Sequence, residues 1–206
     1  MSHEIKLAIK VVIIGDGAVG KTSLCRRFLW KTFTHGYKQT IGADFYVYLW
    51  DTYLEELNVR VDVKWILYDL AGQFVTFQEI RPQFYMGARA ALVVFDISRP
   101  ETFRSIPIWI YEYWKNVSGR NMIEKRPLVL VGNKIDLREK VTNSVPPEWG
   151  KSYAEKLTKS LGFEVPYVET SALYGWGVNE AFKKLLVAVL KYYGLMDRLI
   201  KIVEEK

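Results

Sequence analysis

Residues 7–22 read LAIKVVIIGDGAVGKT, an apolar run followed by a glycine-rich turn. The turn Gly15–Thr22 fits the pattern G-x-x-x-x-G-K-[ST] and stands between an expected strand, Leu7–Ile14, and an expected helix, Lys21–Trp30. Glycines let the backbone bring its N–H groups close to phosphate oxygens, and the helix points its positive dipole end at the same anion. The segment therefore predicts a phosphate-binding loop. A glycine-rich turn without a ligand is the alternative, and the flanking strand and helix argue against it.

The rest of the chain alternates apolar, β-branched runs with segments of helical spacing. The expected elements are strands at 7–14, 45–50, 59–68, 90–95, 128–131 and 165–168 and helices at 21–30, 101–117, 147–161 and 178–193. Several strands are apolar throughout, as expected where helices cover both faces of a parallel sheet. Residues 45–50 alternate in side-chain type and suit an antiparallel partner of 59–68 at the sheet edge. We expect a three-layer α/β domain whose six-stranded sheet is mostly parallel, with one antiparallel edge strand and helices on both faces.

The composition is that of an ordinary folded domain, half apolar and a quarter charged over 206 residues. We assign residues 1–194 to this domain and residues 195–206, which follow Gly194, to a C-terminal extension that forms a short helix or tail. Because Cys25 is the single cysteine, no apolar run reaches the roughly 18–20 residues of a membrane span, and residues 1–4 lack the layout of a secretory signal, we expect a cytoplasmic protein. The net charge of +6 is spread along the chain, so no nucleic-acid partner is expected.

A second motif, Asn133-Lys134-Ile135-Asp136, follows the expected strand at 128–131. An aspartate here can accept hydrogen bonds from both N1–H and the N2 amine of guanine, whereas adenine would leave the carboxylate unpaired. The stem of Lys134 can lie along the base, and Asn133 can hold neighbouring loops. Alone, the motif is also typical of a surface turn. Its place after a strand, downstream of the phosphate loop, favours a guanine site.

These residues resemble those of Ras-like small GTPases. Five elements stand in that family's order: Gly15–Thr22, Thr40, Asp69–Gln73, Asn133–Asp136 and Thr170–Ala172. The resemblance spans about residues 6–193 and is strongest to the Rab branch. Residues 40–45 resemble the Rab effector-loop segment, and residues 84–88 resemble the Rab stretch that follows the second switch. It implies the P-loop fold of a Ras-like G domain.

The motifs and the resemblance together imply a site for GTP or GDP with Mg²⁺. The nucleotide contacts would come from Gly15, Gly17, Ala18, Val19, Gly20, Lys21, Thr22, Ser23, Phe33, Tyr37, Thr40, Gly72, Asn133, Lys134, Asp136, Ser171, Ala172 and Leu173. The metal would be held by Thr22, Thr40 and Asp69, and Gln73, Lys21 and Thr40 would be the catalytic residues. Gln73 would orient the attacking water.

The function implied is a molecular switch that hydrolyses GTP slowly, because the sequence has no evident built-in arginine finger. Loss of the γ-phosphate would release the loops around Thr40 and Gly72. Effector, exchange and GTPase-activating proteins would then contact residues 36–45 and 70–85. The alternatives are a GTP/GDP-binding module with negligible hydrolysis, a P-loop kinase for a small metabolite, and a membrane-surface protein that uses residues 178–206.

The sequence also departs from the family pattern. Leu70 and Phe74 replace the usual threonine and glutamate around Ala-Gly-Gln, and Leu173 stands where a lysine is common. Asp16, in the phosphate loop, would put a negative side chain near the nucleotide. No cysteine follows Cys25 and residue 2 is a serine, so no lipid anchor is expected, and peripheral membrane contact through the C-terminal helices stays open. The expected lack of an anchor, the Lys/Glu-rich charge and the rarity of cysteine would suit a prokaryotic or archaeal relative.

Overall fold

The computed structural model describes residues 5–31, 42–55, 59–72, 80–119 and 122–196. In this part the strands are β1 (Ile5–Ile14), β2 (Ala43–Leu54), β3 (Val59–Leu70), β4 (Ala90–Asp96), β5 (Leu128–Asn133) and β6 (Tyr167–Thr170). They form a six-stranded sheet in the order β2-β3-β1-β4-β5-β6. The β2–β3 pair is antiparallel and every other neighbouring pair is parallel. The predicted sheet, with one antiparallel edge strand, is confirmed.

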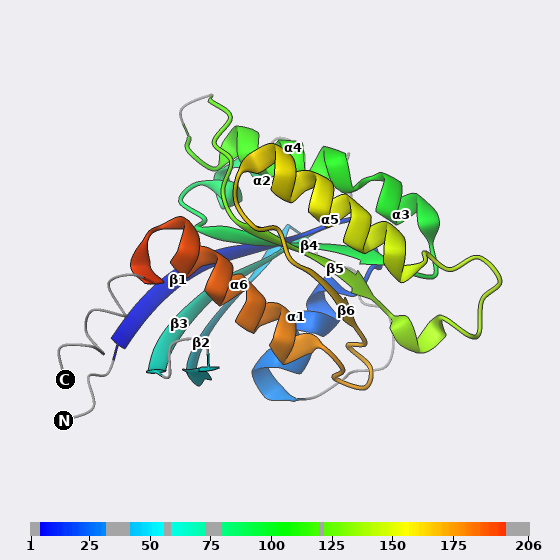
Figure 1. Ribbon diagram of the computed structural model, residues 1–206, viewed down its shortest axis with the longest axis horizontal. Coiled ribbons are helices and arrows are strands. Elements are labelled where there is room, and N and C mark those ends of the chain that lie inside the picture. Colours follow the sequence, from blue (N-terminus) through cyan, green and yellow to red (C-terminus); the bar gives the residue numbers. More distant parts are fainter. Residues whose placement is uncertain (1–4, 32–41, 56–58, 73–79, 120–121, 197–206) are drawn as a thin grey trace.

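Helices cover both faces of the sheet. They are α1 (Lys21–Trp30), α2 (Arg81–Tyr85), α3 (Pro100–Arg104), α4 (Ile106–Asn116), α5 (Pro147–Leu161) and α6 (Val178–Tyr192), with a short 3₁₀ turn, η2 (Ile135–Leu137). Helices α1 and α6 lie on one face, and α2 to α5 lie on the other (Figure 1). Among the described residues, no helix combines the length and apolar character needed to cross a membrane.

The central strand β1 shows how the sequence builds this three-layer arrangement. Val11 and Ile13 belong to the apolar cluster beneath α1 and α6, whereas Val12 and Ile14 belong to the cluster beneath α2, α4 and α5. All four side chains are fully buried. Because successive side chains of a strand point to opposite faces, a continuous apolar run fills both layers, and each such side chain contributes roughly 1.5–3 kcal/mol.

The edge strand β2 is buried on only one face. Tyr46, Tyr48 and Trp50 pack against the core beneath α1 and α6. The residues between them are exposed, and Leu49 is 74% accessible. The alternation seen in the sequence therefore separates an inward aromatic row from an outward row, as in other half-covered edge strands.

Among the differences from the sequence prediction, one helix is divided, one strand is shifted and one helix is added. The helix expected at 101–117 is divided into α3 and α4 at Ser105, because Pro107 lacks an N–H donor and its ring would clash with the preceding helical turn. The strand expected at 165–168 begins only at Tyr167, directly after Pro166, and continues to Thr170. Helix α2 was not expected.

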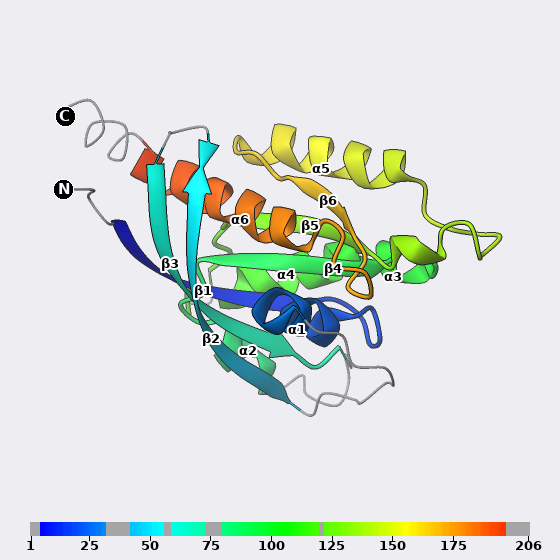
Figure 2. The same ribbon diagram turned by 90° about the horizontal axis from the view of Figure 1, so that it is seen from below.

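The parallel register brings the carboxyl ends of the strands to one edge. Ile13 pairs with Asp69, Asp96 with Asn133, and Asn133 with Thr170. Figure 2 shows these strand ends gathered beside α1, away from the end of the domain where β1 begins. In open α/β sheets this edge is where ligands bind, and it carries the predicted motifs.

Candidate functional site

The phosphate loop joins β1 to α1 and depends on glycine at both ends. Gly15 has φ +137°, and a Cβ there would lie 2.0 Å from the carbonyl oxygen of Val94. Gly20 has φ +98°, and a Cβ there would lie 2.3 Å from Nδ2 of Asn133. Only glycine allows both the backbone conformation and the close approach. Ala18 also has a left-handed backbone, with φ +61°.

Lys21 is the first residue of α1 and is only 6% exposed. Its Nζ donates to the main-chain oxygens of Gly15 and Asp16, both at 2.8 Å. Burial lowers the pKa of Lys21 to about 8, although Asp69 and Asp16 oppose the shift. The ammonium group is thus held inside the curve of the loop, where a phosphate would stabilise its charge.

Asp69 faces the start of α1 from the end of β3. Its Oδ2 accepts a hydrogen bond from the hydroxyl of Thr22. Its Oδ1 is buried and has no hydrogen-bond partner among the described residues. Burial raises the pKa of Asp69 to about 6, against the hydrogen bond from Thr22 and the charge of Lys21. A buried, partly unsatisfied carboxylate of this kind requires a further partner.

A magnesium ion fits this pair of side chains. Carboxylate and hydroxyl oxygens are the ligands that Mg²⁺ prefers, and it commonly binds one or two carboxylates together with substrate phosphates. The described residues contain no cluster of three or more metal-binding side chains of the His, Cys, Asp or Glu type. Thr22 and Asp69 therefore suit a metal completed by a nucleotide rather than one caged by the protein alone.

The loop after β3 approaches the phosphate loop closely. A Cβ on Gly72 would lie 2.4 Å from both the carbonyl oxygen of Asp16 and Nζ of Lys21. The preceding residue, Ala71, donates its N–H to the carbonyl oxygen of Gly42 at 2.9 Å. The backbone of Gly72 thus lies beside Lys21, where a terminal phosphate would reach it.

Asn133 ties three segments together at the other end of the site. Its Oδ1 accepts from the hydroxyl of Thr170 at 3.0 Å and from the N–H of Ala172 at 3.1 Å. Its Nδ2 donates to the carbonyl oxygen of Val19 at 2.9 Å. The side chain is 1% exposed, so these bonds fix the phosphate loop against the segment after β6.

The remaining residues of the predicted guanine site lie beside Asn133. Asp136 accepts a hydrogen bond from the hydroxyl of Ser171. Ala172 is buried and Leu173 is half-buried. Arg27 of α1 holds this segment, because its Nε donates to the carbonyl oxygen of Ala172 at 2.8 Å and its guanidinium also donates to that of Leu173.

Sequence reasoning missed two charged residues here, Asp96 and Arg99. Asp96 is 1% exposed at the end of β4, and its Oδ2 lies 2.7 Å from Nζ of Lys134. Arg99 contacts the same oxygen at 3.2 Å and donates from Nη2 to the carbonyl oxygen of Gly17 at 2.7 Å. Burial opposes ionisation, but the hydrogen bonds from Lys134 and Ser98 outweigh it and lower the pKa of Asp96. This carboxylate therefore connects the phosphate loop to the base loop. Its position after a strand was the available clue.

The carboxylate of Asp16 contacts a side chain outside the phosphate loop. Its Oδ1 accepts a hydrogen bond from Nε1 of Trp109 at 2.6 Å. The half-buried Ser23 lies in the first turn of α1. Phe33, Tyr37, Thr40 and Gln73 lie outside the described residues, so their predicted roles stay predictions.

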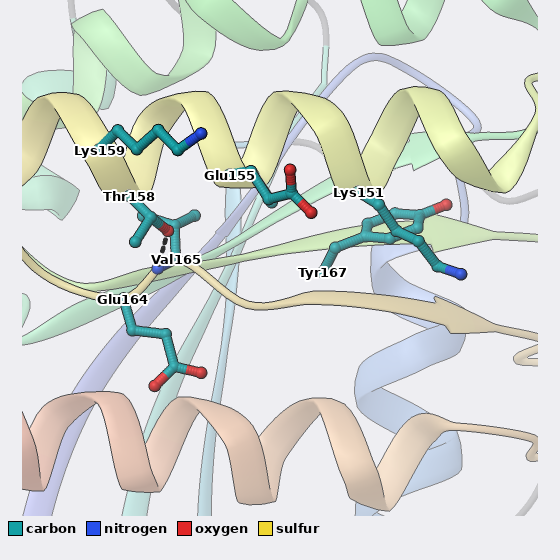
Figure 3. Close-up of a pocket in the computed structure, with 8 residues that line it drawn as sticks. Lys151, Glu155, Thr158, Lys159, Glu164, Val165 and Tyr167 are labelled. Carbon is teal, nitrogen blue, oxygen red and sulfur yellow. Dashed lines mark hydrogen bonds between the residues drawn. The ribbon is translucent and has the colours of Figure 1, made fainter.

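A separate hollow of about 360 Å³ lies between α5 and the segment before β6 (Figure 3). Thr158 accepts a hydrogen bond there from the N–H of Val165 at 2.9 Å. Lys151, Glu155, Lys159 and Glu164 surround the opening. None of the residues predicted to contact nucleotide lines this hollow, so the strand ends remain the candidate site.

Comparison with known proteins identifies the family. The Ras family model matches residues 10–191. The chain belongs to the Ras family. Ras-related protein Rab7 of Drosophila melanogaster is 36% identical over 184 residues, covering 89% of this chain and 81% of that protein. Ras-related protein RABA1b of Arabidopsis thaliana is 39% identical over 185 residues, covering 88% and 75%. Ypt/Rab-type GTPase ypt7 of Schizosaccharomyces pombe is 34% identical over 194 residues, covering 93% and 86%.

These relatives confirm the resemblance to the Rab branch of the Ras family. The Ras-family chain is accordingly a small GTPase that binds guanine nucleotide. The identities cover most of each sequence, so they concern the whole domain rather than the phosphate loop alone.

Proposed function

We propose that this Ras-family protein binds GTP and GDP with Mg²⁺, hydrolyses GTP to GDP and phosphate, and acts as a switch through the loops around Thr40 and Gly72. The observation that carries the proposal is the meeting of Lys21, the Thr22–Asp69 pair and the Asn133–Asp136 segment at one edge of the sheet. Phosphate, metal and base would each find a matching group there.

At the phosphate end, Lys21 reaches from the loop and binds the β- and γ-phosphates. The bound Mg²⁺ supplies Lewis-acid stabilisation of the phosphate oxygens, with Thr22, Asp69 and Thr40 holding it. Lys21 stabilises negative charge that develops as water attacks the γ-phosphorus in line with the leaving GDP, and Gln73 orients that water.

At the base end, the carboxylate of Asp136 accepts from N1–H and the N2 amine of guanine. Lys134 lies along the base, and the segment Ser171–Leu173 covers its edge, with Phe33 and Tyr37 contributing from outside the described residues. Asn133 holds this end to the phosphate loop, which supports a preformed pocket rather than one built by the ligand.

Single-turnover hydrolysis of GTP tests the enzymatic part of this proposal. Intrinsic turnover should be slow, on the order of 10⁻⁴ to 10⁻³ s⁻¹, and Gln73→Leu should reduce it by at least about tenfold while leaving GTP bound. Equal rates in the two proteins would remove Gln73 from the mechanism. No phosphate release over hours from a bound GTP complex would instead favour a binding module without hydrolysis.

We further propose that the G domain comprises residues 1–194, followed by an extension at 195–206. Effector, exchange and activating proteins would contact residues 36–45 and 70–85. Cytoplasmic localisation and the absence of a nucleic-acid partner remain predictions of the sequence. Liposome co-sedimentation with and without residues 195–206 tests contact of the extension with membranes.

A further inference from the structure

Asp16 connects the interior of the phosphate loop to a buried side chain outside it. Its carbonyl oxygen accepts from Nζ of Lys21 at 2.8 Å, and the backbone of Gly72 packs directly against it. Its carboxylate points the other way and accepts from Nε1 of Trp109 at 2.6 Å. A shift of the Asp16 carboxylate would therefore displace the backbone that cradles Lys21.

Trp109 in turn lies beneath the first residue of α2. The ring is 1% exposed, and the guanidinium carbon of Arg81 sits 4.9 Å from its centroid. Arg81 is 2% exposed, and its Nη1 donates to both carboxylate oxygens of Glu112 at 3.1 and 2.9 Å. Trp109 and Glu112 are three residues apart on α4, so one helix face fixes the guanidinium by ring contact and by ion pair.

The charges of Asp16 and Arg81 both affect the pKa of Lys21. After burial, which is the largest influence, the carboxylates of Asp69 and Asp16 raise the pKa of Lys21 and the guanidinium of Arg81 lowers it. Helix α2 follows directly, in sequence, the segment expected to form the second switch. The start of α2 is joined to the phosphate loop through the contact of Arg81 with Trp109 and the hydrogen bond of Trp109 with Asp16.

We propose that Trp109 and Arg81 are positioning residues that couple α2 to the phosphate loop through Asp16 and thereby slow the release of bound nucleotide. The proposal rests on the function proposed above. If Arg81 is displaced, Trp109 loses the guanidinium group that packs against its ring. Trp109 then no longer fixes the carboxylate of Asp16. The loop loses its outer support, and nucleotide dissociates faster.

The dissociation rate of fluorescently labelled GDP, measured in the presence of Mg²⁺, tests this coupling. Trp109→Phe keeps an aromatic ring beneath Arg81 but removes the N–H donor, and we expect dissociation about tenfold faster, equivalent to about 1.4 kcal/mol. Trp114→Phe is the matched control, because Trp114 lies on the same helix and donates Nε1 to the carbonyl oxygen of Arg126 at 3.1 Å. It should leave the GDP dissociation rate unchanged.

Substitutions at Asp16 distinguish loss of the Trp109–Asp16 hydrogen bond from a general loss of stability. Asp16→Asn retains an acceptor oxygen for Trp109 and should stay within about threefold of the wild-type rate, whereas Asp16→Ala should behave like Trp109→Phe. The double variant Asp16→Ala/Trp109→Phe should be no faster than either single variant, because both remove one shared bond. The two single variants, Asp16→Asn and Asp16→Ala, test the coupling even if Trp109→Phe fails to fold.

The role of Arg81 has its own readout. Indole fluorescence should differ between the GDP form and the form with a non-hydrolysable GTP analogue, and this difference should vanish in Trp109→Phe and shrink in Arg81→Met while persisting in Trp114→Phe. A purely structural role would lower thermal stability in these variants without changing the GDP dissociation rate or this difference.

Equal GDP dissociation rates in wild-type protein, Trp109→Phe and Asp16→Ala would overturn the coupling and leave the proposed function intact. Additive effects in the double variant would also overturn it. A wild-type protein that retains no guanine nucleotide would instead remove the proposed function, and the coupling would fall with it.

Discussion

The phosphate end and the base end of the site satisfy their polar groups differently. At the phosphate end, Lys21 donates to carbonyl oxygens of its own loop, and Oδ1 of Asp69 is buried without a hydrogen-bond partner among the described residues. At the base end, Asn133 already makes three hydrogen bonds within the protein, and Asp96 binds both Lys134 and Arg99. The phosphate end therefore requires a ligand to complete it, whereas the base end is largely organised beforehand.

This difference suggests a division of labour in nucleotide binding. Groups left incomplete gain most from ligand contacts, because their burial cost is already present in the empty protein. Groups held by protein partners gain less but select among ligands, because only a complementary base matches their fixed positions. Affinity should depend mainly on the phosphate end, and selectivity mainly on the base end.

The largest effect should come from Lys21→Met. The variant removes the cation that reaches the β- and γ-phosphates, so the affinity for GDP should fall by about 3 kcal/mol, or roughly 100-fold. The affinity for GMP should change much less, because GMP has no β-phosphate. Equilibrium titration with both nucleotides measures this ratio. A uniform loss for GDP and GMP would contradict the division between the two ends.

A smaller effect is expected from Asp136→Asn, at the base end. Its amide cannot accept from both N1–H and the N2 amine, so the affinity for GDP should fall roughly 10- to 100-fold. Inosine diphosphate lacks the N2 amine and should lose less, so the preference for GDP over inosine diphosphate should narrow. Competition titrations give the two affinities. An unchanged preference would mean that Asp136 does not read the N2 amine.

The smallest effect concerns the stability of the empty protein. Asp96→Asn leaves Lys134 and Arg99 without their shared carboxylate and should reduce the free energy of unfolding by about 1–2 kcal/mol at pH 7. The folded-state pKa of Asp96 is lowered, so the wild-type advantage exists above the unfolded pKa, which is about 3.9 for a free aspartate, and is lost as pH falls through the folded value. Urea unfolding at pH 7 and pH 3.5 should show the gap narrowing. A gap that stays constant would exclude ionised Asp96 as its source.

The sequence predicted the site largely because parallel strands end at a common edge. Gly15, Asp69, Asn133 and Thr170 each follow or close an apolar strand, so pattern and motif placed them together without coordinates. The same reasoning found the antiparallel edge strand from its alternation. Motif spacing alone could not determine the side chains that join these loops.

Those joining side chains depend on directions that periodicity does not encode. Trp109 and Asp16 are 93 residues apart, and nothing in either local pattern shows that the indole meets the carboxylate. The helix is interrupted at Ser105 because of Pro107. The proline is visible in the sequence, but the helical spacing of apolar residues across 101–117 led to the prediction of one continuous helix. Contacts of this kind follow from tertiary packing rather than from local propensity.

Displacement of bound fluorescent GDP by GTP and by ATP, in the presence of Mg²⁺, tests the central claim most directly. We propose that a ligand completes the phosphate end and that the base end is matched to guanine. GTP should therefore displace the probe at concentrations at least about 1,000-fold below those needed for ATP. Displacement by ATP at the same concentrations as GTP would contradict the assignment of a guanine-specific site.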